Sequence, residues 1–191
     1  MWCIGKIDAQ YRERMYDIAE LYGRPYNPLE PVVGTDEKSK QLLENIHQEL
    51  FGKIKKTDYE YKRNGTRNIF VAVEPLAGRR FVQVTKHRKK ADFANYIKIL
   101  VDDIYKDATK IHLVLDNLNT HFKKSFIETF GDEEARRILD KIEFHYTPKH
   151  ASWLNVAEIE IGIMDKQCLN RRIPTEEKMT NELDIMAEKT K

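Results

Sequence analysis

Cysteine, long apolar runs and an excess of charge of one sign are what this 191-residue sequence has little of. Its two cysteines, Cys3 and Cys168, lie far apart and form no CxxC pair, which argues against a disulfide framework and favours a reducing, intracellular setting. The sequence has no eighteen consecutive apolar residues, and its first residues show no cationic flank followed by an apolar run. We therefore expect a soluble, cytoplasmic protein with no membrane partner.

The charges nearly cancel. The chain has 33 Lys and Arg residues against 31 Asp and Glu, a net charge of +2, so any attraction for nucleic acid has to come from local basic segments. The densest are KKTDYEYKRNGTR, residues 55–67, and TKHRKK, residues 85–90. A solvated face is the ordinary explanation of such a run, and contact with a nucleic-acid backbone is the alternative.

The first thirty residues are set apart from the rest. Apolar side chains at helical spacing predict a short amphipathic helix over residues 8–22. The next stretch, GRPYNPLEP, has three prolines within seven residues, which oppose regular structure. We therefore expect residues 1–30 to form a helix and a proline-rich linker, and residues 31–191 to form one main domain.

In the main domain, strand and helix patterns alternate. We expect a short strand over residues 32–35, a hairpin within 67–87, a helix over 91–105 and a buried strand over 111–115. Helices around 122–130 and 133–141, a strand over 142–148 and a helix over about 156–169 follow. This order predicts an α/β layer fold with a mixed sheet flanked by helices.

Three acids stand where hydrophobic periodicity alone would not place them. Asp36 and Asp116 end predicted strands, and Glu158 lies in the first turn of the last predicted helix. Each also has a local explanation: Asp36 as a turn residue, Asp116 as the start of an Asx-turn, and Glu158 as the far end of a capping box with Asn155. Glu160 competes with Glu158, but the two side chains point about 200° apart on a helix, so only one of them can serve a given site.

Strand ends are where sites collect in open α/β sheets. Two carboxylates about 4 Å apart repel by roughly 4 kcal/mol at an effective dielectric constant near 20. Either one of them binds a proton, or a cation lies between them. Oxygen ligands favour Mg²⁺ or Mn²⁺, and three acids suffice to hold two such ions.

The wording around these acids resembles the catalytic region of bacterial insertion-sequence transposases of the mariner superfamily. The matching stretches are VVGTDEK, NGTRNIFVAVEPLAG, LVLDNLNTH, EFHYTPKHASWLNVAEIE and CLNRRIP, and together they span about residues 20–175. The resemblance implies an RNase H-like, retroviral-integrase-like fold. It also implies that Asp36, Asp116 and Glu158 are a catalytic triad that binds two Mg²⁺ or Mn²⁺ ions. It favours Glu158 over Glu160, because Glu158 follows the WLN stretch as the third acid of the family follows its LN.

The same resemblance implies cleavage of double-stranded DNA at transposon ends and strand transfer into target DNA, carried out by a homodimer assembled on the DNA. The family usually carries helix-turn-helix units ahead of this domain, and we expect none in residues 1–30. Two alternatives stay open: an inactive, truncated DNA-binding remnant, and an RNase H-like nuclease without strand transfer.

Several other side chains are candidates for contact with DNA. Asn117 and His121 flank Asp116 and resemble companions of the acid in the family, and Lys149 and His150 precede a helix amino end suited to a phosphate. Trp153 could stack on an unpaired base, and the alternative is a place in the core or a role in anchoring the helix. The basic segment contributes Lys86, Arg88 and Lys89. A zinc site from His121, His145, His150 and Cys168 has no recognised ligand spacing, and we do not expect one.

Overall fold

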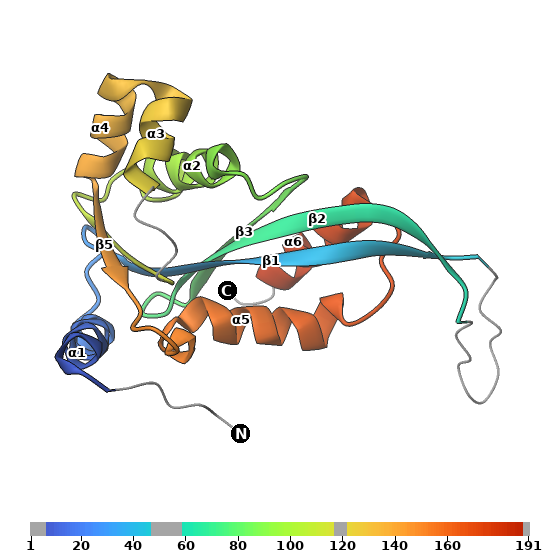
Figure 1. The fold of residues 1–191 in the computed structure, drawn as a ribbon, viewed down its shortest axis with the longest axis horizontal. Helices are drawn as coiled ribbons and strands as arrows, with labels where there is room; N and C mark the ends of the chain where they lie inside the picture. Colours follow the sequence, from blue (N-terminus) through green and yellow to red (C-terminus); the bar gives the residue numbers. More distant parts are fainter. Residues whose placement is uncertain (1–6, 47–58, 117–121, 189–191) are drawn as a thin grey trace.

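A five-stranded sheet in the order β3-β2-β1-β4-β5 forms the centre of the computed structural model (Figure 1). The structure describes residues 7–46, 59–116 and 122–188. The strands are β1 (Val32–Asn45), β2 (Tyr61–Glu74), β3 (Arg79–Thr85), β4 (Ile111–Leu115) and β5 (Ile142–Tyr146). Strand β2 is antiparallel to both of its neighbours, β1 and β3, while β1, β4 and β5 run parallel to one another. The sheet is therefore mixed, as the sequence predicts.

The parallel half of the sheet brings two of the acids level with each other. Val33 pairs with Leu113, and Gly34 pairs with Val114. Two residues further along each chain stand Asp36 and Asp116. Because both strands run the same way, these two residues lie at the same edge of the parallel pair, where β4 ends and β1 continues.

Helices cover both faces of the sheet (Figure 1). One face carries α2 (Lys90–Ile99), the π-helical turn η1 (Leu100–Ile104), α3 (Phe122–Phe130) and α4 (Asp132–Asp140), packed around a buried cluster that includes Phe70, Tyr96 and Leu113. The other face carries the short 3₁₀ turn η2 (Ser152–Leu154), α5 (Val156–Met164), the π-helical turn η3 (Asp165–Leu169) and α6 (Glu176–Glu188). There Leu42, Ile69 and Val71 meet Met164 and the apolar side of α6.

Helix α1 (Ala9–Gly23) packs on the parallel end of the sheet. Ile18 and Leu21 are fully buried against Val32 and Val114, and Asp8 caps the helix by accepting a 2.8 Å hydrogen bond from the Tyr11 amide. The proline-containing segment then leads into β1, with Leu29 bonded through its carbonyl to the Thr109 amide. The division into two segments at residue 30 stays a prediction.

The predicted elements are present, with two differences. Strand β1 does not end at Thr35 but continues to Asn45, so the prediction that Asp36 ends a strand, and with it the turn-residue alternative, is wrong. The polar half of β1 is held by partners that no local pattern reveals: Lys38 pairs with Asp165, and Lys40 donates to the Leu169 carbonyl. Helix α6 was not predicted. None of the helices in the described ranges is both long enough and apolar enough to cross a membrane.

Candidate active site

Asp36 lies on the face of β1 that looks toward α5. Side chains alternate along a strand, and the even-numbered positions of β1 meet this face: Gly34 contacts the start of α5, Lys38 pairs with Asp165, and Leu42 enters the core below α6. The Asp36 carboxylate is half-buried and accepts a 2.8 Å hydrogen bond from the Glu37 amide. Its position on the strand thus directs it toward the helix that carries Glu158.

The start of α5 is pressed against β1 at Gly34. A Cβ atom at this position would lie 2.7 Å from Val156 Cγ2 and 2.9 Å from Asn155 Oδ1, closer than such atoms approach. Asn155 is fully buried, donates a 2.9 Å hydrogen bond to the Thr35 carbonyl and accepts one of 3.2 Å from the Ala157 amide. It therefore caps α5 and ties the helix to β1 beside Asp36.

The two glutamates of α5 point in different directions, as their spacing predicts. Glu160 is buried and forms an ion pair with Arg80 at 2.9 Å. Glu158 is exposed in the first turn. The predicted capping box does not form, because the Asn155 amide donates instead to the Ser152 carbonyl at 2.7 Å. Glu160 is thus committed to a structural pair, while Glu158 remains accessible.

Asp116 follows β4 directly and is half-buried. Its Oδ1 accepts a 3.1 Å hydrogen bond from the Thr147 hydroxyl. Thr147 follows β5 and is itself fixed by a 3.0 Å bond from its amide to the Leu115 carbonyl. One threonine therefore holds the carboxylate at the edge of the sheet.

The three acids share one electrostatic environment. Burial raises the pKa of Asp36 to about 6, and the negative charges of Asp116 and Glu158 add to the rise, against a lowering by the Glu37 amide. The pKa of Glu158 is raised by burial and then by Asp116. Like charges that raise each other's pKa mark a place where a cation is favoured. In the described ranges, His112, Glu143 and His145 form a group whose ligand atoms all lie within 4.8 Å of one another. The three acids do not form such a group.

The basic segment between β3 and α2 lies beside these acids. Arg88 approaches Glu37 to 3.9 Å, and Glu37 is the neighbour of Asp36. Burial raises the pKa of Glu37, Arg88 lowers it, and Asp116 raises it again. Lys86, Arg88 and Lys89 are all exposed, and Arg88 links this segment to the strand that carries Asp36.

The other predicted DNA contacts fall into two groups. Lys149 and His150 are exposed in the turn after β5, where His150 adopts a positive φ of 63°. Trp153 is 54% exposed in the η2 turn, so the alternative of a place in the core is wrong for this side chain. Asn117 and His121 lie outside the described residues.

Sequence reasoning identified Asn155 only as a candidate helix cap and missed the tertiary contacts that position the acids. Thr147, Asn155 and Gly34 act through contacts between elements far apart in the chain, and no local pattern reports such contacts. It also missed a group formed by His112 with Glu143 and His145, although the alternation of Glu143 and His145 along one strand was a usable signal. Of the four residues of the zinc set considered from the sequence, Cys168 is buried in the core below α6, His145 contacts Asp17 and His112, and His121 lies outside the described residues.

Comparisons with known proteins agree with this geometry. Among solved structures, "Mos1 transposase paired-end complex with left transposon end" is similar, with a TM-score of 0.64 and 12% identity over 98% of this chain and 57% of that chain. "Crystal structure of the Mos1 mariner paired end complex with Mn" gives 0.60 and 13% over 99% and 58%. The simian T-cell lymphotropic virus intasome in complex with PP2A regulatory subunit B56 gamma gives 0.52 and 14% over 84% and 50%.

These likenesses establish an RNase H-like fold shared with transposases and retroviral integrases, and this chain spans little more than half the length of the proteins compared. A search of curated proteins found no match. The family model described as "DDE superfamily endonuclease" matches residues 31–180, which is most of the chain. The chain therefore belongs to the DDE superfamily of endonucleases.

Proposed function

We propose that this chain is the catalytic domain of a transposase that cleaves double-stranded DNA at transposon ends and joins the freed ends to target DNA. The observation that supports this best is that Asp36, Asp116 and Glu158, from β1, the end of β4 and α5, gather at one edge of the sheet, where the charge of Asp116 adds to the effect of burial in raising the pKa of Asp36 and of Glu158. Membership of the DDE superfamily and the likeness to transposase complexes support the same reading.

Enzymes of the DDE superfamily use divalent metals, and one similar structure is a complex with Mn and another with Mg. The donor set here fits such ions, because three carboxylates offer hard oxygen ligands and carry the opposite charge. We assign Asp36, Asp116 and Glu158 as the ligands of two Mg²⁺ or Mn²⁺ ions. Bound cations would offset the electrostatic repulsion among the three carboxylates.

Each residue has a distinct task in this proposal. The bound ions supply activation of the attacking oxygen and stabilisation of the leaving oxygen of a phosphodiester. Asp36, whose pKa is raised to about 6 by burial and by the neighbouring charges, would be kept ionised by the bound ions. Thr147 keeps the Asp116 carboxylate oriented, and the packing of α5 on Gly34 sets the distance of Glu158 from β1.

The exposed cations beside the acids would bind the DNA backbone. Arg88 lies 3.9 Å from Glu37, and Lys86 and Lys89 are exposed in the same segment. Contacts of such cations with the DNA backbone give affinity that depends on salt and not on sequence. Lys149 and His150 add charge near the start of α5. Trp153 offers an exposed ring for stacking on an unpaired base, and Asn117 and His121 are proposed to contact the DNA beside Asp116.

Two further parts of the proposal concern assembly. Several of the similar Mos1 structures are paired-end complexes, and we propose that this chain likewise acts as a homodimer on paired ends. We also propose that residues 31–191 are the catalytic unit, with residues 1–30 as a helix and linker attached to it.

The test is a nicking and joining assay with DNA that carries the element's ends. Asp116→Asn and Glu158→Gln should each lower Mg²⁺-dependent nicking by more than about 100-fold, since loss of residues that merely support a metal ligand already costs 10- to 100-fold. Asp103→Asn and Glu177→Gln are the matched controls, because both acids are exposed and Glu177, like Glu158, lies in the first turn of a helix. Undiminished nicking by the first pair would contradict the assignment.

The products separate the proposal from its alternatives. Joined target products indicate a transposase. Nicking without any joined product indicates a nuclease that lacks the strand-transfer step. Salt-sensitive DNA binding without cleavage in Mg²⁺ or Mn²⁺, even with an intact partner subunit present, indicates an inactive remnant.

A further inference from the structure

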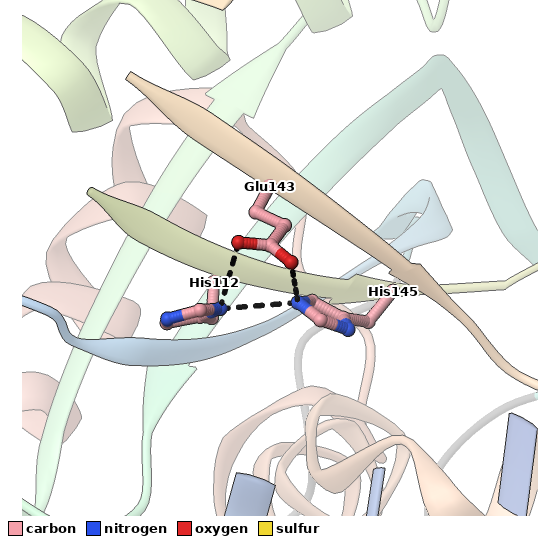
Figure 2. A group of neighbouring side chains, drawn as sticks. All are labelled: His112, Glu143 and His145. Atoms are coloured by element: carbon pink, nitrogen blue, oxygen red, sulfur yellow. Dashed lines mark hydrogen bonds and ion pairs between the residues drawn. The ribbon is translucent and has the colours of Figure 1, made fainter. Parts of the chain in front are cut away.

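Two histidines and a glutamate meet on the face of the sheet that α1 covers (Figure 2). His112 is the second residue of β4, and Glu143 and His145 are the second and fourth residues of β5. Register places His112 beside Glu143 and Val114 beside His145. Since paired residues of parallel strands point to the same face, the alternation of the two strands brings all three side chains together.

The distances between their ligand atoms fit one metal ion. His112 Nδ1 lies 3.1 Å from His145 Nε2 and 3.7 Å from Glu143 Oε2, and His145 Nε2 lies 3.9 Å from Glu143 Oε1. A tetrahedral Zn²⁺ with ligand bonds of about 2.0–2.1 Å requires neighbouring ligand atoms about 3.3–3.4 Å apart. The two separations from Glu143 involve different carboxylate oxygens, but one ligand atom from each residue can be chosen so that all three lie within 4.8 Å of one another. A modest rotation of the exposed Glu143 side chain would therefore bring one oxygen to the distance that the ion requires.

Asp17 of α1 orients one of the rings. Its Oδ2 lies 2.7 Å from His145 Nδ1, so that nitrogen carries the proton and Nε2 keeps a lone pair directed at His112 and Glu143. A carboxylate that holds the far nitrogen of a histidine in this way is the usual support of a metal-binding imidazole. With an ion bound, His112 carries its proton on Nε2, and its Nδ1 faces the ion.

The group is sheltered but accessible. His112 and His145 are each 7% exposed, while Glu143 is exposed at the edge strand. An open cavity of about 300 Å³, bordered by Arg24, Tyr26 and Pro31, reaches His112 and provides a route for an ion. Asp116 lies four positions after His112 along the chain, which places the group about 13 Å from that acid.

We propose that His112, Glu143 and His145 bind one transition-metal dication of the Zn²⁺ type, with water in the fourth position. Imidazole nitrogens suit Zn²⁺, whereas Mg²⁺ and Mn²⁺ prefer oxygen ligands, so the two kinds of site are chemically distinct. The ion clamps β4 to β5 and, through Asp17, fixes α1 to the sheet. The proposal does not depend on the proposed transposase activity.

The test is calorimetric titration of the untagged, EDTA-treated chain with ZnCl₂ in a buffer that contains excess Mg²⁺ to occupy hard oxygen sites. We expect one Zn²⁺ per chain. We also expect the unfolding midpoint to rise by about 5–10 °C when free Zn²⁺ is about 100 times Kd. Co²⁺ in place of Zn²⁺ should give the visible absorption of a four-coordinate site.

Variants decide where the ion binds. Glu143→Gln and His112→Gln should each weaken Zn²⁺ binding by more than about 10-fold, and Asp17→Asn by about 10- to 100-fold. Glu143 is exposed, so its variant keeps the fold, which circular dichroism verifies. The double variant Asp36→Asn, Asp116→Asn should bind Zn²⁺ unchanged. Absence of stoichiometric binding, or binding lost in the double variant and retained in Glu143→Gln and His112→Gln, would overturn the proposal and leave a hydrogen-bonded histidine pair.

Discussion

The side-chain amide of Asn155 donates a 2.9 Å hydrogen bond to the backbone carbonyl of Thr35. The two residues are 120 positions apart, and each immediately precedes the segment that presents an acid: Thr35 stands before Asp36, and Asn155 stands three residues before Glu158. The bond is buried. It is therefore the most direct link between the strand and the helix that carry two of the three proposed metal ligands.

Loss of this link should lower both stability and activity. Asn155→Ala removes the cap of α5 and leaves a buried carbonyl without a donor, and we expect the free energy of unfolding to fall by about 2–4 kcal/mol in a denaturant titration. Asp8→Ala is the matched control, because Asp8 caps α1 on the surface. It should lower the free energy of unfolding by about 1 kcal/mol and leave DNA nicking unchanged. Equal losses of nicking in the two variants would contradict the special role of Asn155.

Gly34 should not tolerate a side chain. In Gly34→Ala the new Cβ would meet Val156 Cγ2 at 2.7 Å and Asn155 Oδ1 at 2.9 Å, so α5 has to move away from β1 and carry Glu158 with it. We expect nicking to fall by about 10-fold or more, since a displacement of about 1 Å can lower a rate by about 100-fold. Gly162→Ala is the control, because nothing lies within 4 Å of its added Cβ. A fully active Gly34→Ala enzyme would show that the packing at Gly34 does not position Glu158.

Asp36 makes stability depend on pH. Its pKa of about 6 in the folded protein exceeds the ordinary value of 3.8, so between these values the folded state binds more protons than the unfolded state. The free energy of unfolding therefore falls as pH rises through this window. In EDTA at pH 7, Asp36→Asn should be more stable than wild type by about 1 kcal/mol after allowance for solvent screening, and the gain should vanish near pH 4.

Addition of Mn²⁺ at pH 7 should reverse the order. The ion binds the wild-type carboxylates and raises the unfolding midpoint of the wild-type protein, whereas Asp36→Asn should respond weakly. Thermal unfolding at pH 4 and pH 7, with and without Mn²⁺, checks both halves of this prediction. An Asp36→Asn variant no more stable than wild type in EDTA would show that burial and the neighbouring charges do not raise the pKa of Asp36.

The two glutamates of α5 should separate stability from metal dependence. Glu160→Gln breaks the buried pair with Arg80 and should lower the free energy of unfolding by about 3–5 kcal/mol, while the folded fraction keeps its Mn²⁺ response. Glu158→Gln should leave stability in EDTA nearly unchanged and weaken the Mn²⁺ response. Isothermal titration with Mn²⁺ beside denaturant unfolding distinguishes the two, and the opposite pattern would make Glu160 the third ligand.

Much of this site was predictable because its parts follow local patterns. Four of the five residues of Ile111–Leu115 are apolar and all five are buried, so the strand and the charge that follows it at Asp116 could be predicted from periodicity. The end of β1 could not. Residues 39–45 are mostly polar, and they form a strand because the Leu43 amide bonds to the Ile173 carbonyl and Lys40 reaches the Leu169 carbonyl.

The histidine group was missed for a similar reason. His112 and His145 are 33 residues apart, and the register between β4 and β5 brings His112 Nδ1 to 3.1 Å from His145 Nε2. The role of Gly34 depends on a helix more than 120 residues away. Contacts of this kind are set by tertiary packing and leave no trace in local hydrophobic spacing.

Metal binding by the three acids is tested most directly by crystals grown or soaked in Mn²⁺, with data collected for the anomalous signal of manganese. We expect anomalous peaks bounded by the carboxylates of Asp36, Asp116 and Glu158. These peaks should be lost in Asp116→Asn crystals treated in the same way. Well-ordered carboxylates with no manganese among them at millimolar Mn²⁺ would show that the three acids do not bind the ion.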